Sequence, residues 1–535
     1  MTASSWYDLA GMACFLLLST RKEGNGARCS KLGSIIRQAG MASKKIRFPT
    51  IMRAAIGLLS LIQIANLLHL FRLRVAYPYQ LEWMEGAVLE HIERVSTGQS
   101  LYVAPSVSFT PYLYTPFYYA VSGAMCRVLG FGLEAPRVVS IVATVATLGF
   151  VASFVYEETR DRLAPLVAVA LFVSTYEVTG FWFDLARVDS LFHCLVLASL
   201  WLARFGKSHG AMAGAGATLF LAFFTKQAAL AFLLPLAVFA FATGWKHALN
   251  AIASFSVLTV TATLYLQRIS EGWFTYYVFR VTGQHKVHWD WLAPSFLEYF
   301  IKPYGIALLF TVIVLVIRPR ALQRRRLTAA YVLWLLCAVA SSALSLNHQD
   351  GWVNVLIPAY GALAVVAGFG FGAAQRNRHQ SIVVMSIVMW GIAFAVLVYP
   401  PSRALPTRAD WAAGALVTQA LRSAPAPLWM PGAGYLQALA GHEENSAHTM
   451  ALADIFKTQE PRIRNQLRDD ILVSVRQHRW ASIVIDPSFR MLPPEIMEEI
   501  RRCYRWHQSI FPEHEHGGWP NTGFQTRPQE IWIPR

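Results

Sequence analysis

Long runs of apolar residues, separated by short polar stretches, fill the sequence from residue 51 to residue 399. A helix of about 20 apolar residues can cross the hydrocarbon core of a bilayer, and shorter runs suit inner helices of a packed bundle. The pattern predicts an all-α polytopic membrane protein with about eleven transmembrane helices. We expect these helices over 51–76, 136–156, 164–178, 190–205, 211–224, 228–243, 248–266, 305–317, 328–346, 353–372 and 382–399.

One further apolar segment, 116–130, decides on which side of the membrane every later loop lies. If it lies along the membrane surface as an amphipathic helix, the basic loops all fall on the side of Lys44, Lys45 and Arg47. Because Lys and Arg concentrate in cytoplasmic loops, we expect a surface helix here and a C-terminus on the outer side. The basic loops are 158–162, 204–207, 245–247, 318–326 and 375–379.

The chain divides into three regions by composition. Residues 1–50 form an N-terminal cytoplasmic or disordered segment, in which either Met41 is the true start or residues 1–40 are disordered. Residues 51–399 form the transmembrane domain, with a first outer loop at 77–135. Residues 400–535 have an ordinary charge content, an amphipathic stretch at 454–477 and a β-like stretch at 481–488, so we expect a small α/β domain on the outer side.

Composition agrees with a membrane protein. Of the 535 residues, 55% are hydrophobic and only 15% are charged, whereas a soluble domain is about one-quarter charged. The formal charge of +16 could indicate a nucleic-acid partner. The basic residues lie in short loops between apolar runs, however, so we expect membrane lipid as their partner and no nucleic acid. The six cysteines show no metal-ligand spacing and fit small buried side chains.

Polar clusters gather on the predicted outer face. The sequence YPYQLEWMEG, which follows the first apolar run, carries Glu82 and Glu85. Charged groups at the ends of membrane helices are energetically unfavourable and are more often functional than average. The other clusters on this face are FDLARVD (183–189), FTKQ (224–227), the loop 268–303 and NHQDGWVN (347–354).

Four of these stretches, in order, resemble the GT-C superfamily of integral-membrane glycosyltransferases, in particular the group similar to protein O-mannosyltransferases and aminoarabinose transferases. They are WMEGAVLEHIERVSTGQSLY (83–102), TPYLYTPFYYAVSGAMCRVLG (110–130), FDLARVDSL (183–191) and AFFTKQAAL (222–230). The resemblance covers 51–266 well and the later helices in outline. One departure stands out: where the family pattern has Asp then Glu, this chain has Met84 then Glu85, with Glu82 two positions before Met84.

The resemblance implies a hexosyl or pentosyl transferase that uses a sugar carried on a polyprenyl phosphate. Its acceptor would be a lipid, a glycan or a protein. It would act on the outer face of the cytoplasmic (inner) membrane, with the C-terminal domain in the periplasm or outside the cell. The expected partners are therefore the lipid-linked donor, the acceptor and membrane lipid.

Transfer to a hydroxyl needs a carboxylate base and cations for the departing phosphate. We expect Glu85 as the base, with Glu82 as its helper or alternate. An i, i+3 pair shares one helical face, so one carboxylate could raise the pKa of the other. Equally, the pair could cap or solvate a surface helix. The expected phosphate ligands are Lys226, Arg187 and Arg137, and the expected sugar or acceptor ligands are Asp189, His348, Asp350 and Asn354.

Structural roles compete with these assignments. Lys226 could extend its ammonium to lipid headgroups, and Arg187 with Asp189 could form a loop ion pair. His285 and His288, close to Asp290, form a His-x-x-His pattern that could bind a divalent metal or belong to a polar loop facing headgroups. No other cofactor is expected.

Two other classes of protein fit part of the pattern. A transporter or flippase for a lipid-linked or glycan substrate would show internal repeats and binding groups near the bilayer midplane. No repeat is evident, and the charged groups gather at one surface. A scaffold whose outer tail binds partners would not need the carboxylates after the first helix. No GxxxxGK[ST] or strand-linked GxGxxG motif indicates nucleotide binding.

Overall fold

The computed structural model describes residues 48–317, 325–512 and 516–535. The predicted N-terminal segment 1–50, with the question of Met41, lies almost wholly outside the described residues, and so does most of the basic loop 318–326. The residues Pro49–Arg535 form one compact unit. The C-terminal region therefore packs with the membrane helices and is no separate compact body.

Every predicted apolar run contains an α-helix. They are α3 (Phe48–Arg74), α6 (Glu134–Thr159), α7 (Leu163–Ser174), α8 (Asp189–Phe205), α9 (His209–Phe223), α10 (Leu233–Thr243), α11 (Trp245–Ile269), α15 (Lys302–Ile317), α16 (Arg325–Leu346), α17 (Ile357–Gln375) and α18 (Gln380–Val396). The described residues include 5 helices long and apolar enough to cross a membrane, or 6 if the bent pair Gln380–Val396 and Pro401–Ser423 counts as one span. The remaining apolar helices are shorter. The chain is a multi-pass membrane protein, and the count of about eleven crossings stays a prediction.

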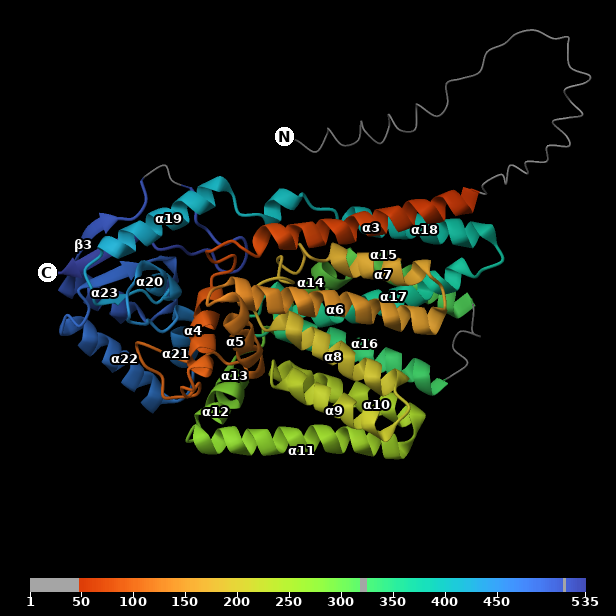
Figure 1. The fold of residues 1–535 in the computed structure, drawn as a ribbon, viewed down its shortest axis with the longest axis horizontal. Helices are drawn as coiled ribbons and strands as arrows, with labels where there is room; N and C mark the ends of the chain where they lie inside the picture. The colour runs from red at the N-terminus through yellow and green to blue at the C-terminus, as the bar shows by residue number, and fades with distance from the viewer. Residues whose placement is uncertain (1–47, 318–324, 513–515) are drawn as a thin grey trace, which may run out of the picture. The chain divides into compact units, whose positions relative to one another are not determined.

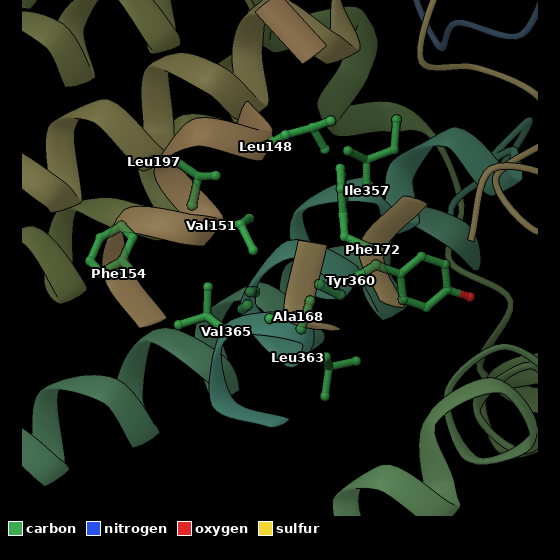
Figure 2. Close-up of a cluster of buried hydrophobic side chains, with 14 of the residues drawn as sticks. Leu148, Val151, Phe154, Ala168, Phe172, Leu197, Ile357, Tyr360, Leu363 and Val365 are labelled. Atoms are coloured by element: carbon green, nitrogen blue, oxygen red, sulfur yellow. The ribbon is translucent and has the colours of Figure 1, made fainter. Parts of the chain in front are cut away.

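Helix α17 lies at the centre of the membrane domain, where small residues let neighbouring helices approach closely. A Cβ added at Gly368 would lie 2.8 Å from Ala168 Cβ and from Val155 Cγ2, so α7 and α6 touch the backbone of α17 there. Figure 2 shows apolar side chains of α6, α7, α8 and α17 pointing toward one another in this core.

The loops predicted to be cytoplasmic meet at one end of the helices. Arg204, at the end of α8, forms an ion pair with Glu158 at 2.5 Å, near the end of α6. The ring of His209 lies 4.8 Å from the ring of His247, which connects the starts of α9 and α11. These basic loops therefore lie together, and their sidedness stays a prediction.

The first outer loop contains two helices, α4 (Glu85–Ser96) and α5 (Phe117–Leu129). At 13 residues, α5 is too short to span a bilayer, as expected for the segment 116–130. Both helices share a hydrophobic core with the C-terminal region, which buries Val88, Ile92 and Tyr119 together with Trp429 and Ile483. Figure 1 shows α4 and α5 between the membrane helices and the C-terminal helices α20 and α21.

The C-terminal region is a small α/β assembly, as predicted. Its helices are α19 (Arg408–Ser423), α20 (Tyr435–Ala440), α21 (Thr449–Phe456), α22 (Pro461–Arg476) and α23 (Pro494–Cys503). Its strands are β1 (Leu428–Trp429), β2 (Ser482–Ile485), β3 (Tyr504–Ser509) and β4 (Glu530–Pro534), in the order β1-β2-β4-β3. Strands β1 and β2 are parallel, and the other pairs are antiparallel.

Sequence explains these elements locally. Strand β2, SIVI, is a buried β-branched run inside the predicted stretch 481–488. The predicted amphipathic stretch 454–477 is divided between α21 and α22, because Pro461 begins a new helix at a position where its missing N–H costs nothing.

Short helical segments connect the longer helices. They are η2 (Gln227–Phe232), α12 (Trp273–Thr275), η3 (Tyr276–Val281), α13 (Thr282–Gln284), η4 (Trp289–Trp291), α14 (Leu292–Phe296), η5 (Leu297–Ile301), η7 (Val353–Leu356), η8 (Pro401–Ala404) and η9 (Pro487–Met491). Those between 273 and 301 make up most of the predicted outer loop 268–303.

Candidate active site

Glu85 begins helix α4 and is completely enclosed. Its two carboxylate oxygens accept bonds from Arg137 Nε at 3.0 Å and Arg137 Nη2 at 2.7 Å. The backbone N–H groups of Ala186 and Leu81 donate to the same carboxylate at 2.8 and 2.7 Å. Burial alone would raise the pKa of Glu85, but the charge of Arg137 and these donors outweigh burial and lower the pKa. Glu85 is therefore an ionised, fully bonded carboxylate.

Arg137 is equally engaged. Besides its two bonds to Glu85, its guanidinium donates to the backbone carbonyls of Arg74, Tyr77 and Tyr79. A guanidinium has five N–H donors, so every donor of Arg137 has a protein acceptor. Arg137 therefore connects the start of α6 to the chain segment that follows α3. It has no donor left for the phosphate that it was predicted to bind.

Glu82, on the turn before α4, has a different environment. Arg187 Nη1 donates to Glu82 Oε2 at 3.0 Å, and the N–H of Met84 donates to the same oxygen at 3.1 Å. The other oxygen, Oε1, is buried and has no hydrogen-bond partner among the described residues. Burial, only partly offset by Arg187, raises the pKa of Glu82 to about 7. A carboxylate with this pKa can exchange a proton at neutral pH.

Tyr114 joins Arg187 to the second predicted cation. Arg187 Nη2 donates to the hydroxyl of Tyr114 at 3.2 Å. The Tyr114 ring centroid lies 5.7 Å from the Arg187 guanidinium and 5.9 Å from Lys226 Nζ. Both cations therefore face one aromatic side chain from the first outer loop.

Asp189 holds Lys226 in place. Lys226 Nζ lies 2.6 Å from Asp189 Oδ1, and Trp182 Nε1 donates to Asp189 Oδ2 at 2.8 Å. The Asn354 side chain lies beside the same carboxylate. Asp189 and Lys226 line a cavity of about 10 Å³, room for about one water molecule. The rest of its lining comes from α8, η2, α16 and the 355–358 segment: Phe192, Ala228, Ser341, Ser345, Val355 and Pro358.

A third buried ion pair supports the loop that carries Arg187. Arg74, at the end of α3, donates through Nε to Asp184 at 2.7 Å, and the Tyr176 hydroxyl donates to the other oxygen of Asp184 at 2.6 Å. Neither side chain of the ion pair is exposed by more than 1%. The segment FDLARVD thus uses Asp184 for support, while Arg187 and Asp189 point toward Glu82 and Lys226.

The C-terminal region contacts the same turn. The Trp83 ring lies 4.8 Å from the ring of His448 and 5.1 Å from the ring of Phe524. His448 Nε2 bonds to the Trp83 carbonyl at 3.1 Å, and its Nδ1 accepts from the N–H of Met450 at 3.2 Å. Burial lowers the pKa of His448 to about 3, so this imidazole is a neutral structural group.

The remaining predicted ligands form a second cluster. His348 and His285 have ring centroids 5.1 Å apart, and His285 Nε2 lies 3.6 Å from Asp454 Oδ1 of α21. Lys457 of the C-terminal region pairs with Asp350 at 2.5 Å. These contacts connect the outer loops to the C-terminal region, so His348 and Asp350 lie in this cluster, whereas Asp189 and Asn354 lie beside Lys226.

His285 and His288, the pair predicted as metal ligands, have different surroundings. Val287 pairs with His348 as an isolated β-bridge, and His288, which follows Val287, is exposed. Within the described parts of the chain, no group of three or more His, Cys, Asp or Glu side chains is arranged to hold a metal ion. His285 has Asp454 as its nearest acid instead of the expected Asp290.

Several residues of this site were not expected from the sequence. Tyr114 and Trp182 bond the predicted residues Arg187 and Asp189 directly. Arg74, Asp184 and His448 support the segments that carry the predicted residues, through bonds between distant parts of the chain. The available signal was weak: Asp184 and Trp182 stand within or beside FDLARVD, and Arg74 is a charge at the end of an apolar helix.

Comparison with solved structures identifies the fold. ArnT from Cupriavidus metallidurans in the apo state has a similar structure, with a TM-score of 0.57 and 12% identity over 90% of this chain and 98% of that chain. The structure of the same protein bound to undecaprenyl phosphate gives a TM-score of 0.55 and 13% identity over 88% and 97%. No protein-family model and no curated protein matches the sequence. The chain shares the fold of these ArnT structures, in agreement with the fold that the sequence resemblance implied.

Proposed function

We propose that this chain is a membrane glycosyltransferase that moves a sugar from a polyprenyl-phosphate carrier to an acceptor hydroxyl. One observation carries the proposal: the buried Glu82 is bonded to Arg187 through one oxygen, has its other oxygen unpaired among the described residues, and has a pKa raised to about 7. The shared fold of ArnT, which has been solved with undecaprenyl phosphate, supports the class of donor.

Glu82 is the proposed base. Both acidic candidates from the sequence lie in the site, but Glu85 has its acceptor capacity filled by Arg137 and backbone N–H groups. Taking a proton at Glu85 would leave the buried charge of Arg137 without its counter-charge, which is costly. Glu85 and Arg137 therefore act as the support on which the turn with Glu82 is built.

Lys226 and Arg187 are the proposed phosphate ligands. Lys226 lines the small cavity between α8, η2 and α16 and forms an ion pair with Asp189. Arg187 lies between Glu82 and Tyr114, and its Nε has no partner among the described residues. Both cations can stabilise the negative charge that grows on a leaving phosphate.

The reaction follows from these positions. The acceptor oxygen attacks C1 of the sugar, and its proton passes to the Glu82 carboxylate. The bond between C1 and the phosphate oxygen breaks, and its electron pair leaves with the lipid phosphate beside Lys226 and Arg187. We propose a hexose or pentose as the sugar, and a lipid, glycan or protein as the acceptor.

The proposed location follows from sidedness. The site lies at the end of the helices opposite the basic loops around Arg204 and His247, so it would face away from the cytoplasm across the inner membrane. The C-terminal region, which contacts Trp83 at the site, would then be periplasmic or extracellular. A labelling reagent confined to the outer compartment should reach a C-terminal tag; labelling only after permeabilisation would contradict this orientation.

A reconstitution assay separates the transferase from the flippase alternative. Purified protein in liposomes is given polyprenyl-phosphate hexoses and pentoses with membrane extract as the source of acceptors. We expect release of free polyprenyl phosphate with at least one donor and appearance of the sugar in a new product. Movement of an intact labelled donor between leaflets, without cleavage, would overturn the proposal in favour of transport.

A further inference from the structure

The connection between β3 and β4 is unusually long for a hairpin. Ser509 and Glu530 are paired in the antiparallel ladder, so residues 510–529 all lie between two adjacent strands. Hairpin connections usually have about 2–5 residues, and much longer ones are commonly functional. The described residues 519–526 of this connection, called the covering loop below, reach back to the candidate base.

The covering loop pairs with the turn that carries Glu82. The N–H of Thr522 donates to the carbonyl of Leu81 at 3.3 Å, and Thr522 forms a parallel bridge with Glu82. A Cβ added at Gly180 would lie 2.8 Å from Thr522 Oγ1, so Thr522 also touches the loop that carries Arg187. The covering loop therefore lies against both segments that supply the Glu82–Arg187 pair.

Gly523 lies directly on the unpaired oxygen of Glu82. An added Cβ would be 2.9 Å from Glu82 Oε1 and 3.0 Å from Trp83 Cδ1. Gly523 has a φ of +81°, a conformation that other residues adopt only with strain. Glycine is therefore needed here both for its backbone conformation and because no side chain fits over the carboxylate.

Phe524 fixes the position of Gly523. Its ring lies 5.1 Å from the Trp83 ring, and the guanidinium of Arg490 lies 4.5 Å from its centroid. The ring is thus held between the turn that carries Glu82 and a cation of the C-terminal region.

We infer that the covering loop positions the candidate base: Gly523 and Phe524 keep water away from Glu82 Oε1, so that the carboxylate is dry and more basic than an exposed one. This inference rests on the proposed function for its catalytic meaning, although the effect of the loop on Glu82 can be measured without any substrate. A dry carboxylate also disfavours water as a competing acceptor. The C-terminal region thereby gains a role in the reaction.

Other charged and titratable groups around Glu82 set the background for this test. Arg187 and Glu85 act on Glu82 directly. Tyr112, from the first outer loop, and His448, from the C-terminal region, lie in the same environment. The covering loop itself contributes no ionisable group next to Glu82, so its effect must come from the exclusion of water.

The experiment is an infrared difference titration of the Glu82 carboxyl in nanodiscs, with Glu82→Gln to assign the signal. In Gly523→Ala the added Cβ would lie 2.9 Å from Oε1, too close to fit, so the covering loop has to move away from Glu82. Phe524→Ala removes the ring that anchors the loop. Both variants should therefore let water reach the carboxylate. The matched control is Gly441→Ala, because Gly441 has a similar φ of +91° and an added Cβ there would meet nothing within 4 Å. Phe524→Tyr tests rescue by an aromatic ring.

Wild-type Glu82 should titrate near pH 7, and Gly523→Ala and Phe524→Ala should lower its pKa by about one unit or more. Gly441→Ala and Phe524→Tyr should leave it unchanged. Equal titration of Glu82 in wild type, Gly523→Ala and Phe524→Ala would overturn the inference, as would an equal shift in Gly441→Ala. If Gly523→Ala does not fold, the comparison of the Glu82 pKa between Phe524→Ala and Phe524→Tyr tests the inference. The titration needs no lipid-linked sugar. A failure of the proposed transferase activity would therefore appear separately, as absence of cleavage of the lipid-linked sugar by the wild-type protein.

Discussion

Arg187 Nη1 lies 3.0 Å from Glu82 Oε2, while Oε1 of the same carboxylate has no hydrogen-bond partner among the described residues. This half-satisfied pair differs from its neighbour, in which Arg137 binds both oxygens of Glu85. Two acids three positions apart therefore have opposite properties: one is a fixed structural anion, and the other can gain and lose a proton. The difference comes from the number of donors: Arg137 and backbone N–H groups bond both oxygens of Glu85, whereas burial of the unpaired oxygen dominates at Glu82.

Glu85→Gln should destabilise the protein. It leaves the buried guanidinium of Arg137 without its counter-charge, a loss of about 3–5 kcal/mol in the free energy of unfolding. Thermal unfolding in detergent measures this, and Glu85→Gln with Arg137→Met should recover much of the loss because no unpaired charge remains. A Glu85→Gln variant with wild-type stability but no transfer would instead make Glu85 the base.

The rate of transfer should depend on the ionisation of Glu82. With a pKa near 7, the ionised fraction falls about tenfold for each pH unit well below 7, and kcat should fall in parallel. Arg187→Met removes the cation that favours the ionised form of Glu82, so the pH range over which kcat falls should move to higher pH. The measurement is the pH profile of kcat from pH 5 to 9; a flat profile down to pH 5 would contradict the assignment.

Lys226→Gln should weaken binding of polyprenyl phosphate about 10- to 100-fold, because a charge-assisted bond to the phosphate is lost. Asp189 keeps the bond from Trp182 in this variant, so the site should stay folded. Lys302→Gln is a suitable control, since Lys302 pairs with Glu298 on the exposed surface. Binding of labelled polyprenyl phosphate measures the effect, and equal affinity of both variants would exclude Lys226 as a phosphate ligand.

Asp454 should make stability depend on pH. Burial raises its pKa from 3.8 to about 8, because the uncharged side chain is favoured in the folded protein. The resulting contribution to the free energy of unfolding is complete below about pH 4 and is lost as the pH rises through 8. The slope can reach about 1.4 kcal/mol per pH unit. Asp454→Asn should flatten the decline of the melting temperature between pH 5 and 9, whereas the exposed Asp469→Asn should not. Identical slopes in wild type and Asp454→Asn would show that Asp454 is solvated.

Gly368→Ala should lower the free energy of unfolding by about 1–3 kcal/mol through overpacking. The new methyl group would lie 2.8 Å from Ala168 and Val155, on two neighbouring helices. Gly391→Ala, in α18, is the control because an added Cβ there meets nothing within 4 Å. Equal stability of the two variants would mean that α17 is less tightly packed than described.

The sequence predicts the helices of this protein well because their signal is local. Each apolar run can be read from consecutive residues, and the short segment 116–130 could be placed from the charges of distant loops alone. The β-branched run in β2 was likewise visible without neighbours. The helices and the strand depend on what lies next to a residue in the chain, whereas the placement of 116–130 depends on the charges of distant loops.

The site was only partly predictable because its contacts join distant residues. Glu82 and Glu85 look alike in sequence, and the distinction depends on Arg137 and Arg187, which approach from two later segments. The spacing of His285 and His288 does not indicate which side chains surround His285, because the pairing of Val287 with His348 is a tertiary contact. The contact of Gly523 with Glu82 joins residues from opposite ends of the chain, and no local pattern indicates it.

The most direct test of the proposed mechanism is single-turnover transfer by wild type, Glu82→Gln and Glu90→Gln in liposomes. Glu90 is a suitable control because it is buried in the same helix region, and burial raises its pKa well above the usual value, so glutamine replaces a neutral acid. Glu82→Gln should lose about 10²- to 10⁴-fold in rate while remaining folded, and Glu90→Gln should keep near-normal turnover. Near-normal transfer by Glu82→Gln would contradict the account.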